Sequence, residues 1–312
     1  MELKVPADFA DNLAGLTPAG IPPGEPAQAE SEPVPVSRGV ALRGRLNRNR
    51  TLVLGIFLVG GLLLLAILGP FLAQFDPNSG NISDSLVGPS PTHLFGTDYE
   101  GRDMFTRVLY GARIAMGISV GCVVVSMIVG TLLGLLAAYV GGVVGSVIMR
   151  ILDIVISFPY VVLVIAVLAV LGPGLFSVAV AIAAVDWTSY GRIIYGQVLS
   201  VREREFVESS RSLGASPVRI MLRHILPNVA TPAVVYATLD ISQVILLMSA
   251  LSFLGLGAQP PTSDWGTMIA DGRVYIYSAW WITTFPGLMI MLTGTSFAIL
   301  GDGLADAMNR RR

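Results

Sequence analysis

The sequence predicts an all-α membrane protein with six transmembrane helices and with both termini on the inner side. Of its 312 residues, 53% are hydrophobic and 13% are charged, whereas a soluble globular protein is about 25% charged. Six apolar stretches are each long enough to cross a hydrocarbon layer of about 30 Å as a helix. Such stretches must be helical, because lipid cannot satisfy the open backbone groups of other conformations.

The first part of the chain, residues 1–37, is rich in Pro, Ala, Gly and Glu and has no apolar run long enough to insert. This composition is typical of disorder. We therefore expect a disordered cytoplasmic tail over 1–37 and a transmembrane domain over 38–312. Five arginines, from Arg38 to Arg50, precede the first apolar stretch at 51–75.

The other five spans are expected at about 114–139, 148–171, 175–196, 229–254 and 280–300. Their orientation follows from the basic residues, which are enriched in cytoplasmic loops. With the N-terminus inside, 16 of the 20 Lys and Arg residues fall on the inner side. The segment 76–112 then lies outside, and the longest inner loop is 197–228.

Composition also excludes several classes of protein. The single lysine, Lys4, is not part of a Gly-Lys-Ser/Thr sequence, so the chain has no Walker-type phosphate loop of its own. One Cys and two His residues are too few for a disulfide framework or a zinc cluster. The net charge of −1 argues against a nucleic-acid partner. We expect no catalytic residue, metal site or bound cofactor in this chain.

Three pairs of glycines stand four residues apart: Gly117 and Gly121, Gly130 and Gly134, and Gly141 and Gly145. This spacing places both glycines of a pair on one face of a helix. Without side chains on that face, a second helix can approach closely. We therefore expect tight helix contacts at these pairs.

Several of the expected spans contain an aspartate. A carboxylate at the centre of a transmembrane helix costs about 2.5–3.5 kcal/mol on insertion scales, so it should face a cavity or a polar partner. Asp186, followed by Trp187, lies mid-span. It either lines a substrate pathway or pairs with a polar group of a neighbouring helix. Asp153 and Asp302 lie near the inner face, where roles at helix ends or interfaces are favoured, and the sequence assigns no role to Asp240.

The inner loop can be divided by its Gly, Ser and Pro residues. Residues 203–213 are charged and helix-prone, which predicts a helix along the membrane surface. Gly214 is typical of a helix C-terminus, and Ser216 before Pro217 is typical of the start of a second helix. We expect this second helix to be short and the fifth span to begin at Pro227. A solvated charged loop would have the same composition.

The outer segment 94–103 has the features of a tight turn before a helix. Gly96 and Gly101 permit backbone paths that other residues resist. Thr97 and, three residues later, Glu100 match a capping box. The pattern predicts that the helix leading into the second span starts here, and a stable turn of this kind needs no further function.

The inner loop also resembles the EAA loop of ABC-importer permeases. The sequence Glu208-Ser209-Ser210 is followed by Gly214 six residues after the glutamate and by Leu226-Pro227 at eighteen and nineteen. Two serines replace the alanines of the family pattern, so small side chains are kept. His224 stands where that pattern has Ile.

Three further segments resemble the dipeptide, oligopeptide and nickel branch of this permease family. They are residues 94–103, residues 251–261 with Trp265 and Gly266, and residues 285–287 with 301–304. The resemblance extends over about residues 40–308 and leaves out the N-terminal tail.

The resemblance implies a type I ABC importer permease fold in the bacterial inner membrane. It implies that the loop at 197–228 docks on a cytoplasmic ATPase subunit. The residues that it assigns to this coupling are Glu205, Glu208, Ser209, Ser210, Gly214, Ala215, Leu226 and Pro227. It also implies that the segment 76–112 is an extracytoplasmic scoop beneath a substrate-binding protein. The scoop residues are Gly96, Thr97, Asp98, Gly101, Arg102 and Asp103.

The function implied is translocation of short peptides that a binding protein delivers. The chain would pair with a homologous second permease within the membrane lipid, and one or two separate ATPase subunits would bind ATP and Mg²⁺. For the substrate pathway we expect Asp186, Trp187 and Met248. Met248 stands where relatives commonly carry Glu, so a contact with a cationic group at that position is in doubt. The alternative function is a self-sufficient ion-coupled carrier or channel, in which Asp186 and Asp240 would bind protons or ions.

Overall fold

The computed structural model describes the backbone of residues 38–309 and the side chains of residues 50–308. The expected tail at 1–37 lies outside the described residues. The chain divides at Leu42 into two compact units, and the second unit, from Arg43 onward, contains the helices that position the functional sites.

The described chain is built from helices and the loops between them. The elements in order are α2 Arg38–Leu72, η1 Ile82–Asp84, α3 Met104–Val140, α4 Gly142–Ser157, α5 Tyr160–Leu171, α6 Leu175–Val201, α7 Glu205–Ser212, α8 Pro217–Arg219, η2 Ile220–Ile225, α9 Leu226–Phe253, α10 Trp265–Gly272, η3 Arg273–Tyr275 and α11 Trp281–Asn309. An isolated β-bridge joins Thr97 and Asp103 in the loop before α3.

Four stretches are long and apolar enough to cross a membrane: Arg50–Leu72, Met104–Val140, Pro217–Phe253 and Trp281–Met308. The bent pair α4 and α5 would count as a fifth. The all-α membrane class is therefore confirmed, with four or five candidate spans. The expected fourth span corresponds to α6, which is not among the candidates and contains the charged residues Asp186 and Arg192.

The third expected span is not one straight helix. Helix α4 ends at Ser157, α5 begins at Tyr160, and their axes differ in direction by 95°. The cause is Pro159, which lacks an amide hydrogen and forces the preceding residue out of the helical region. Phe158 accordingly has φ −89° and ψ 146°, which is extended backbone. The prediction of one span at 148–171 did not take this proline into account.

The second helix of the inner loop is continuous with the fifth span, whereas the sequence predicts a separate short helix. Helices α8 and α9 and the π-helical turn η2 form one continuous helix, Pro217–Phe253. In η2 the amide of Leu226 donates to the carbonyl of Met221, five residues back. This wider turn directly precedes Pro227 and lets the helix continue past a residue that lacks an amide hydrogen.

Helix α3 packs most extensively on α6, and glycines of α3 make this contact possible. A Cβ at Gly130 would collide with the carbonyl of Trp187, and one at Gly134 would collide with the carbonyl of Gly191. Gly117 and Gly121, by contrast, have open space where a Cβ would lie. Of the two glycine pairs within α3, the second therefore provides the close helix contact within the chain.

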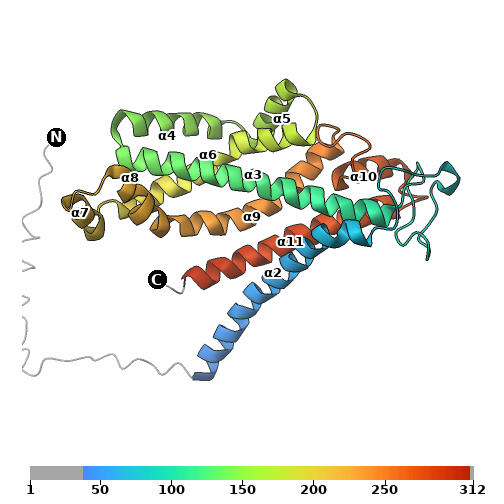
Figure 1. The fold of residues 1–312 in the computed structure, drawn as a ribbon, viewed down its shortest axis with the longest axis horizontal. Helices are drawn as coiled ribbons and strands as arrows, with labels where there is room; N and C mark the ends of the chain where they lie inside the picture. Colours follow the sequence, from blue (N-terminus) through green and yellow to red (C-terminus); the bar gives the residue numbers. More distant parts are fainter. Residues whose placement is uncertain (1–37, 310–312) are drawn as a thin grey trace, which may run out of the picture. The chain divides into compact units, whose positions relative to one another are not determined.

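The long helices place the two main loop regions at opposite ends. Figure 1 shows α7 and α8 at one end of α3 and α9, and the segment before α3 together with α10 at the other. Large apolar side chains remain exposed between these ends, such as Phe57 and Phe71 on α2 and Val143 on α4. Apolar surface of this kind needs lipid or another chain to cover it.

The glycine contact leads to a prediction about stability. Gly134→Ala should lower the thermal stability of the chain in detergent, because the added methyl group would overlap α6; overpacking of this kind costs about 1–3 kcal/mol. Gly117→Ala is the matched control on the same helix. It should be neutral or stabilising by up to about 1 kcal/mol, because Ala favours helix and meets no neighbour. Thermal unfolding of both variants checks the prediction, and equal midpoints would contradict it.

Candidate functional site

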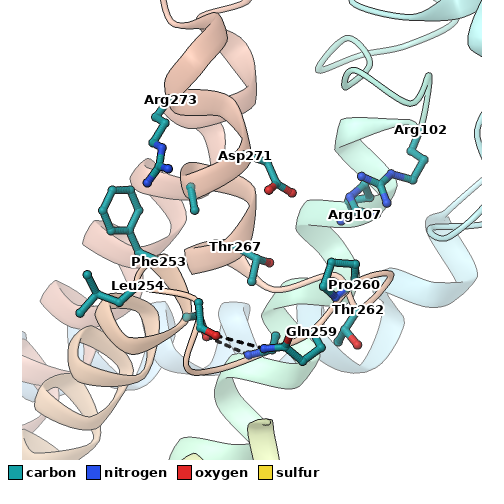
Figure 2. Close-up of a pocket in the computed structure, with 14 residues that line it drawn as sticks. Arg102, Arg107, Phe253, Leu254, Gln259, Pro260, Thr262, Thr267, Asp271 and Arg273 are labelled. Carbon is teal, nitrogen blue, oxygen red and sulfur yellow. Dashed lines mark hydrogen bonds between the residues drawn. The ribbon is translucent and has the colours of Figure 1, made fainter. Parts of the chain in front are cut away.

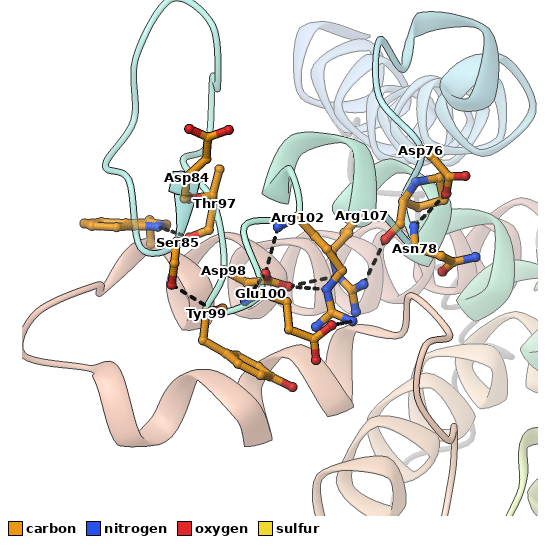
Figure 3. Close-up of polar contacts among 12 residues, drawn as sticks. Asp76, Asn78, Asp84, Ser85, Thr97, Asp98, Tyr99, Glu100, Arg102 and Arg107 are labelled. Atoms are coloured by element: carbon orange, nitrogen blue, oxygen red, sulfur yellow. Dashed lines mark hydrogen bonds and ion pairs between the residues drawn. The ribbon is translucent and has the colours of Figure 1, made fainter. Parts of the chain in front are cut away.

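The loop before α3 and the first turn of α3 contain a group of charged residues, which we call the loop cluster: Asp98, Glu100, Arg102 and Arg107. All of them except Glu100 are buried. Figure 3 shows how Asp98 connects its members. Its Oδ1 accepts hydrogen bonds from the amides of Glu100 and Arg102, both at 2.9 Å. Its Oδ2 accepts from Nε of Arg102 at 2.7 Å and lies 3.7 Å from Nε of Arg107. Asp98, Arg102 and Arg107 are all buried, so the loss of one partner would leave an uncompensated buried charge, which is strongly destabilising.

Two glycines allow the backbone to wrap around this cluster. Gly96 and Gly101 have φ of +73° and +74°, a region that L-residues other than glycine seldom adopt. A Cβ at Gly101 would also collide with the carbonyl of Asn81. The tight backbone path expected at Gly96 and at Gly101 is therefore confirmed.

Thr97 does not cap the helix that leads into the second span, which corrects the capping box expected with Glu100. Its hydroxyl donates to the carbonyl of Asp84 at 2.5 Å and accepts from the amide of Val87 at 2.8 Å. The helix begins only at Met104, and Asp103 is its cap, with Oδ2 accepting from the amide of Thr106 at 2.8 Å. The hydroxyl of Thr97 is occupied by loop hydrogen bonds to residues distant in the sequence and is not available to a helix.

Beside the loop cluster is a cavity of about 380 Å³, which we call the loop cavity. Figure 2 shows Arg102, Arg107 and Asp271 facing one another across it, with Gln259 and Pro260 from the loop after α9. Burial raises the pKa of the Asp271 carboxyl above its ordinary value, an effect that Arg102 and Arg107 reduce. Arg273 also lines the cavity, so its charged residues are three arginines and one aspartate, and the lining is mainly basic.

A second cavity, of about 490 Å³, lies beside α6 and α9, and we call it the membrane cavity. It is lined by Val155, Ile156, Phe158, Tyr160, Val185, Asp186, Thr188, Ser189, Tyr236, Asp240 and Gln243. Asp186 and Asp240 are each only 4% exposed. The hydroxyl of Tyr190 donates to Oδ2 of Asp240 at 2.6 Å.

The other two residues expected in the substrate pathway do not line this cavity. Met248 is fully buried in the apolar core. The indole of Trp187 donates to the carbonyl of Ala184 at 3.0 Å, within its own helix. Asp240, to which the sequence assigned no role, lies with Asp186 instead. Its mid-span position was a signal in the sequence, but only the folded chain brings the two helices together.

Asp153 and Asp302 lie away from the membrane cavity. Asp153 pairs with Nη2 of Arg192 at 2.6 Å, and both side chains are about half exposed. An exposed pair of this kind contributes at most about 1 kcal/mol. Asp302 is exposed on α11. Within residues 50–308, no three side chains of His, Cys, Asp or Glu come together as a metal site would require.

The inner loop forms a helix–bend–helix unit, which we call the elbow, residues 205–219. Helix α7 ends before Gly214, whose φ is +77°, and Ser216 accepts a hydrogen bond from the amide of Arg219 at 3.4 Å as the cap of the next helix. The expected bend and caps are therefore confirmed. One buried residue, Val207, attaches α7 to the rest of the chain.

The outer face of the elbow is unusually apolar for a charged loop. Leu213, next to the bend, is 88% exposed, and Phe206 and Val218 are also exposed, as is Leu222 in the π turn that follows the elbow. Of the residues expected in coupling, Glu205, Glu208, Ser209, Gly214 and Pro227 are exposed, while Ser210, Ala215 and Leu226 are half-buried. A fully solvated loop would have no reason to expose so much apolar surface.

Comparison with known families covers most of the chain. A family described as "Binding-protein-dependent transport system inner membrane component" matches residues 130–312. A second family, described as the N-terminal TM domain of oligopeptide transport permease C, matches residues 39–89.

Individual relatives match over nearly their full lengths. The dipeptide transport system permease protein DppC of Escherichia coli is 44% identical over 286 residues, which are 89% of this chain and 95% of that protein. The protein of the same name from Alkalihalophilus pseudofirmus is 43% identical over 85% of this chain and 87% of its own. The probable D,D-dipeptide transport system permease protein DdpC of Escherichia coli is 40% identical over 80% and 83%.

A solved structure shares the fold. The inward-facing MetNI methionine ABC transporter superposes with a TM-score of 0.52 at 18% identity, over 64% of this chain and 94% of that chain. Because one family covers more than half of the chain and relatives above 40% identity extend over most of it, the chain belongs to the inner membrane components of binding-protein-dependent transport systems, as a multi-pass permease subunit and not an enzyme.

Proposed function

We propose that this chain is the permease subunit of an ABC importer that moves short peptides, dipeptides foremost, into the cell. The observation that carries the substrate class is the similarity to a dipeptide permease over 89% of this chain and 95% of the relative. An ion-coupled carrier, the alternative from the sequence, would need no ATPase partner. The exposed apolar elbow favours the importer, because a carrier has no soluble subunit to cover it.

The orientation that we propose has six spans with both termini inside. Under this orientation the elbow, with its arginines, faces the cytoplasm and the loop cluster faces outward. The positive-inside distribution supports it, with 16 of 20 Lys and Arg residues inside. So does the position of the elbow and the loop cluster at opposite ends of the long helices (Figure 1).

The elbow is the proposed contact with the ATPase. Leu213 and Phe206 supply exposed apolar surface, and Glu205 and Glu208 supply exposed charge on the same short helix. An apolar centre with a charged rim is typical of a protein interface. ATP and Mg²⁺ would bind only to the ATPase subunits, and a movement of those subunits would shift the population of permease conformations.

The outer loop that the buried loop cluster holds together is the proposed contact with the extracytoplasmic binding protein. Its internal hydrogen bonds make the loop a firm surface, since Asp98 alone accepts three of them. A homologous second permease would cover the exposed apolar surface of the spans that lipid does not cover, and would complete the pathway.

The importer hypothesis predicts that uptake depends on ATP. Proteoliposomes holding the complete complex, with binding protein outside and ATP inside, should accumulate a labelled dipeptide. A non-hydrolysable analogue in place of ATP should abolish this accumulation, because ATP hydrolysis supplies the energy. The hydrolysis occurs on the ATPase subunits, since the permease has no phosphate loop of its own. Accumulation driven by a proton or sodium gradient without ATP would favour the carrier instead.

The elbow predicts that docking is sensitive to its bend. In Gly214→Val, keeping the left-handed backbone of the bend would cost about 1–2 kcal/mol. If the bend opens to avoid this cost, binding to the ATPase should weaken about tenfold. Glu208→Lys reverses an exposed charge at the same contact. Both variants should insert normally but lose ATPase pull-down and uptake. Gly196→Val, at a helical glycine with open space around it, is the control and should bind the ATPase. If both elbow variants pull down the ATPase normally, the elbow is not the ATPase contact and the loop is only a solvated connection.

The orientation can be checked with reporters. A reporter that is active only in the cytoplasm should be active when fused after Arg312 or within 202–211, and silent within 78–92. The arginine distribution makes this result expected. Activity at 78–92 would reverse the orientation and remove the elbow from the cytoplasm.

A further inference from the structure

The membrane cavity contains two carboxylates without a counter-ion. Asp186 comes from α6 and Asp240 from α9, and both are 4% exposed. The ion pairs found within residues 50–308 include neither residue. The two groups lie close enough for each to affect the charge of the other. Two acids this close and this buried hold no more than one negative charge between them unless a cation joins them.

The hydrogen bonds of the pair leave one acceptor free. Oδ2 of Asp240 is occupied by the hydroxyl of Tyr190 at 2.6 Å, which holds that carboxylate in place. Oδ2 of Asp186 is buried and has no hydrogen-bond partner among the described residues. Buried polar atoms of native proteins nearly always have a partner. The hydroxyl of Ser126 on α3, likewise buried and unpaired, is close enough to interact with Asp186. A neutral hydroxyl does not balance the charge of the two acids, which leaves that role to a donor from outside this chain.

The lining of the cavity indicates what kind of cation would fit. A volume of about 490 Å³ is in the range of small-molecule sites and far exceeds a bare ion. Tyr160, Tyr236 and Phe158 place aromatic rings around the acids, and such rings attract organic ammonium groups. Within the described residues, no third metal-binding side chain joins the pair.

We propose that Asp186 and Asp240 form a binding site for the primary ammonium group of the transported substrate. The free oxygen of Asp186 accepts a hydrogen bond from the ammonium, while Asp240, held by Tyr190, supplies the second negative charge. This site rests on the proposed function, because a short peptide carries such a group at its N-terminus. The residues that line the cavity include no basic side chain, so the carboxylate end of the peptide is not held here.

Direct binding to the purified complete complex, without the binding protein, tests this site. Labelled dialanine should bind, and N-acetyl-dialanine, which lacks the ammonium group, should bind about tenfold more weakly or worse. Asp186→Asn and Asp240→Asn should each weaken dialanine binding by a similar factor and abolish the preference over the acetylated peptide. Asp186→Glu, which keeps the charge, should retain the preference. Asp153→Asn, which removes a carboxylate paired with Arg192 outside the cavity, is the matched control and should bind as the wild type does.

A measurement on the wild type alone covers the case in which a variant does not assemble. Butylammonium should displace labelled dialanine, and butyrate at the same concentration should not. The proposal is overturned if dialanine does not bind, if both peptides bind equally, if butylammonium does not compete, or if assembled Asn variants keep the preference. Uptake by the same complex with ATP and binding protein tests the importer function separately. Uptake of dialanine without the ammonium preference would refute this site alone, whereas absence of ATP-dependent uptake would refute the proposed function.

Discussion

The close contact of α3 with α6 is the interaction on which the arrangement of the other helices depends. It exists because Gly130 and Gly134 present bare backbone to the carbonyls of Trp187 and Gly191. Between lipid-exposed helices there is little hydrophobic gain from association, so packing of this closeness is a main source of affinity. The contact fixes α6 in place, and with it the position of Asp186 relative to α9.

A single continuous helix joins the elbow, the membrane cavity and the loop cavity. Pro217–Phe253 starts in the elbow, passes Asp240 in the membrane cavity and ends at Phe253, which lines the loop cavity. A rigid helix transmits displacement along its length, which is a simple physical route between the proposed ATPase contact and the proposed substrate site. The π turn at Ile220–Ile225 is an irregular place in this helix, and it lies directly beside the elbow. Turns of this type often occur at functional positions.

The loop cluster and the membrane cavity differ in whether their buried charges are compensated within the chain. In the loop cluster, Asp98 pairs with Arg102 and lies 3.7 Å from Arg107, so opposite charges compensate one another within the chain. In the membrane cavity, Asp186 and Asp240 have the same sign, and only hydroxyl and amide groups accompany them. The first arrangement is complete without a ligand and serves to hold a loop. The second lacks a positive charge to balance its two acids, and this difference separates a structural cluster from a candidate binding site.

The sequence by itself determined the features that depend on neighbouring residues. Apolar length made the spans helical, Gly214 with Ser216 and Pro217 made the elbow, and Gly96 with Gly101 made the tight loop. These signals are local because helix periodicity, caps and left-handed turns involve only a few adjacent residues. The bend at Pro159 was equally local and could have been predicted. Only the tertiary structure decided that Asp103 and not Thr97 caps α3, that Gly130 and not Gly117 contacts α6, and that Asp240 joins Asp186. Each of these outcomes depends on which helices and loops become neighbours in space, and no pattern along the chain contains that information.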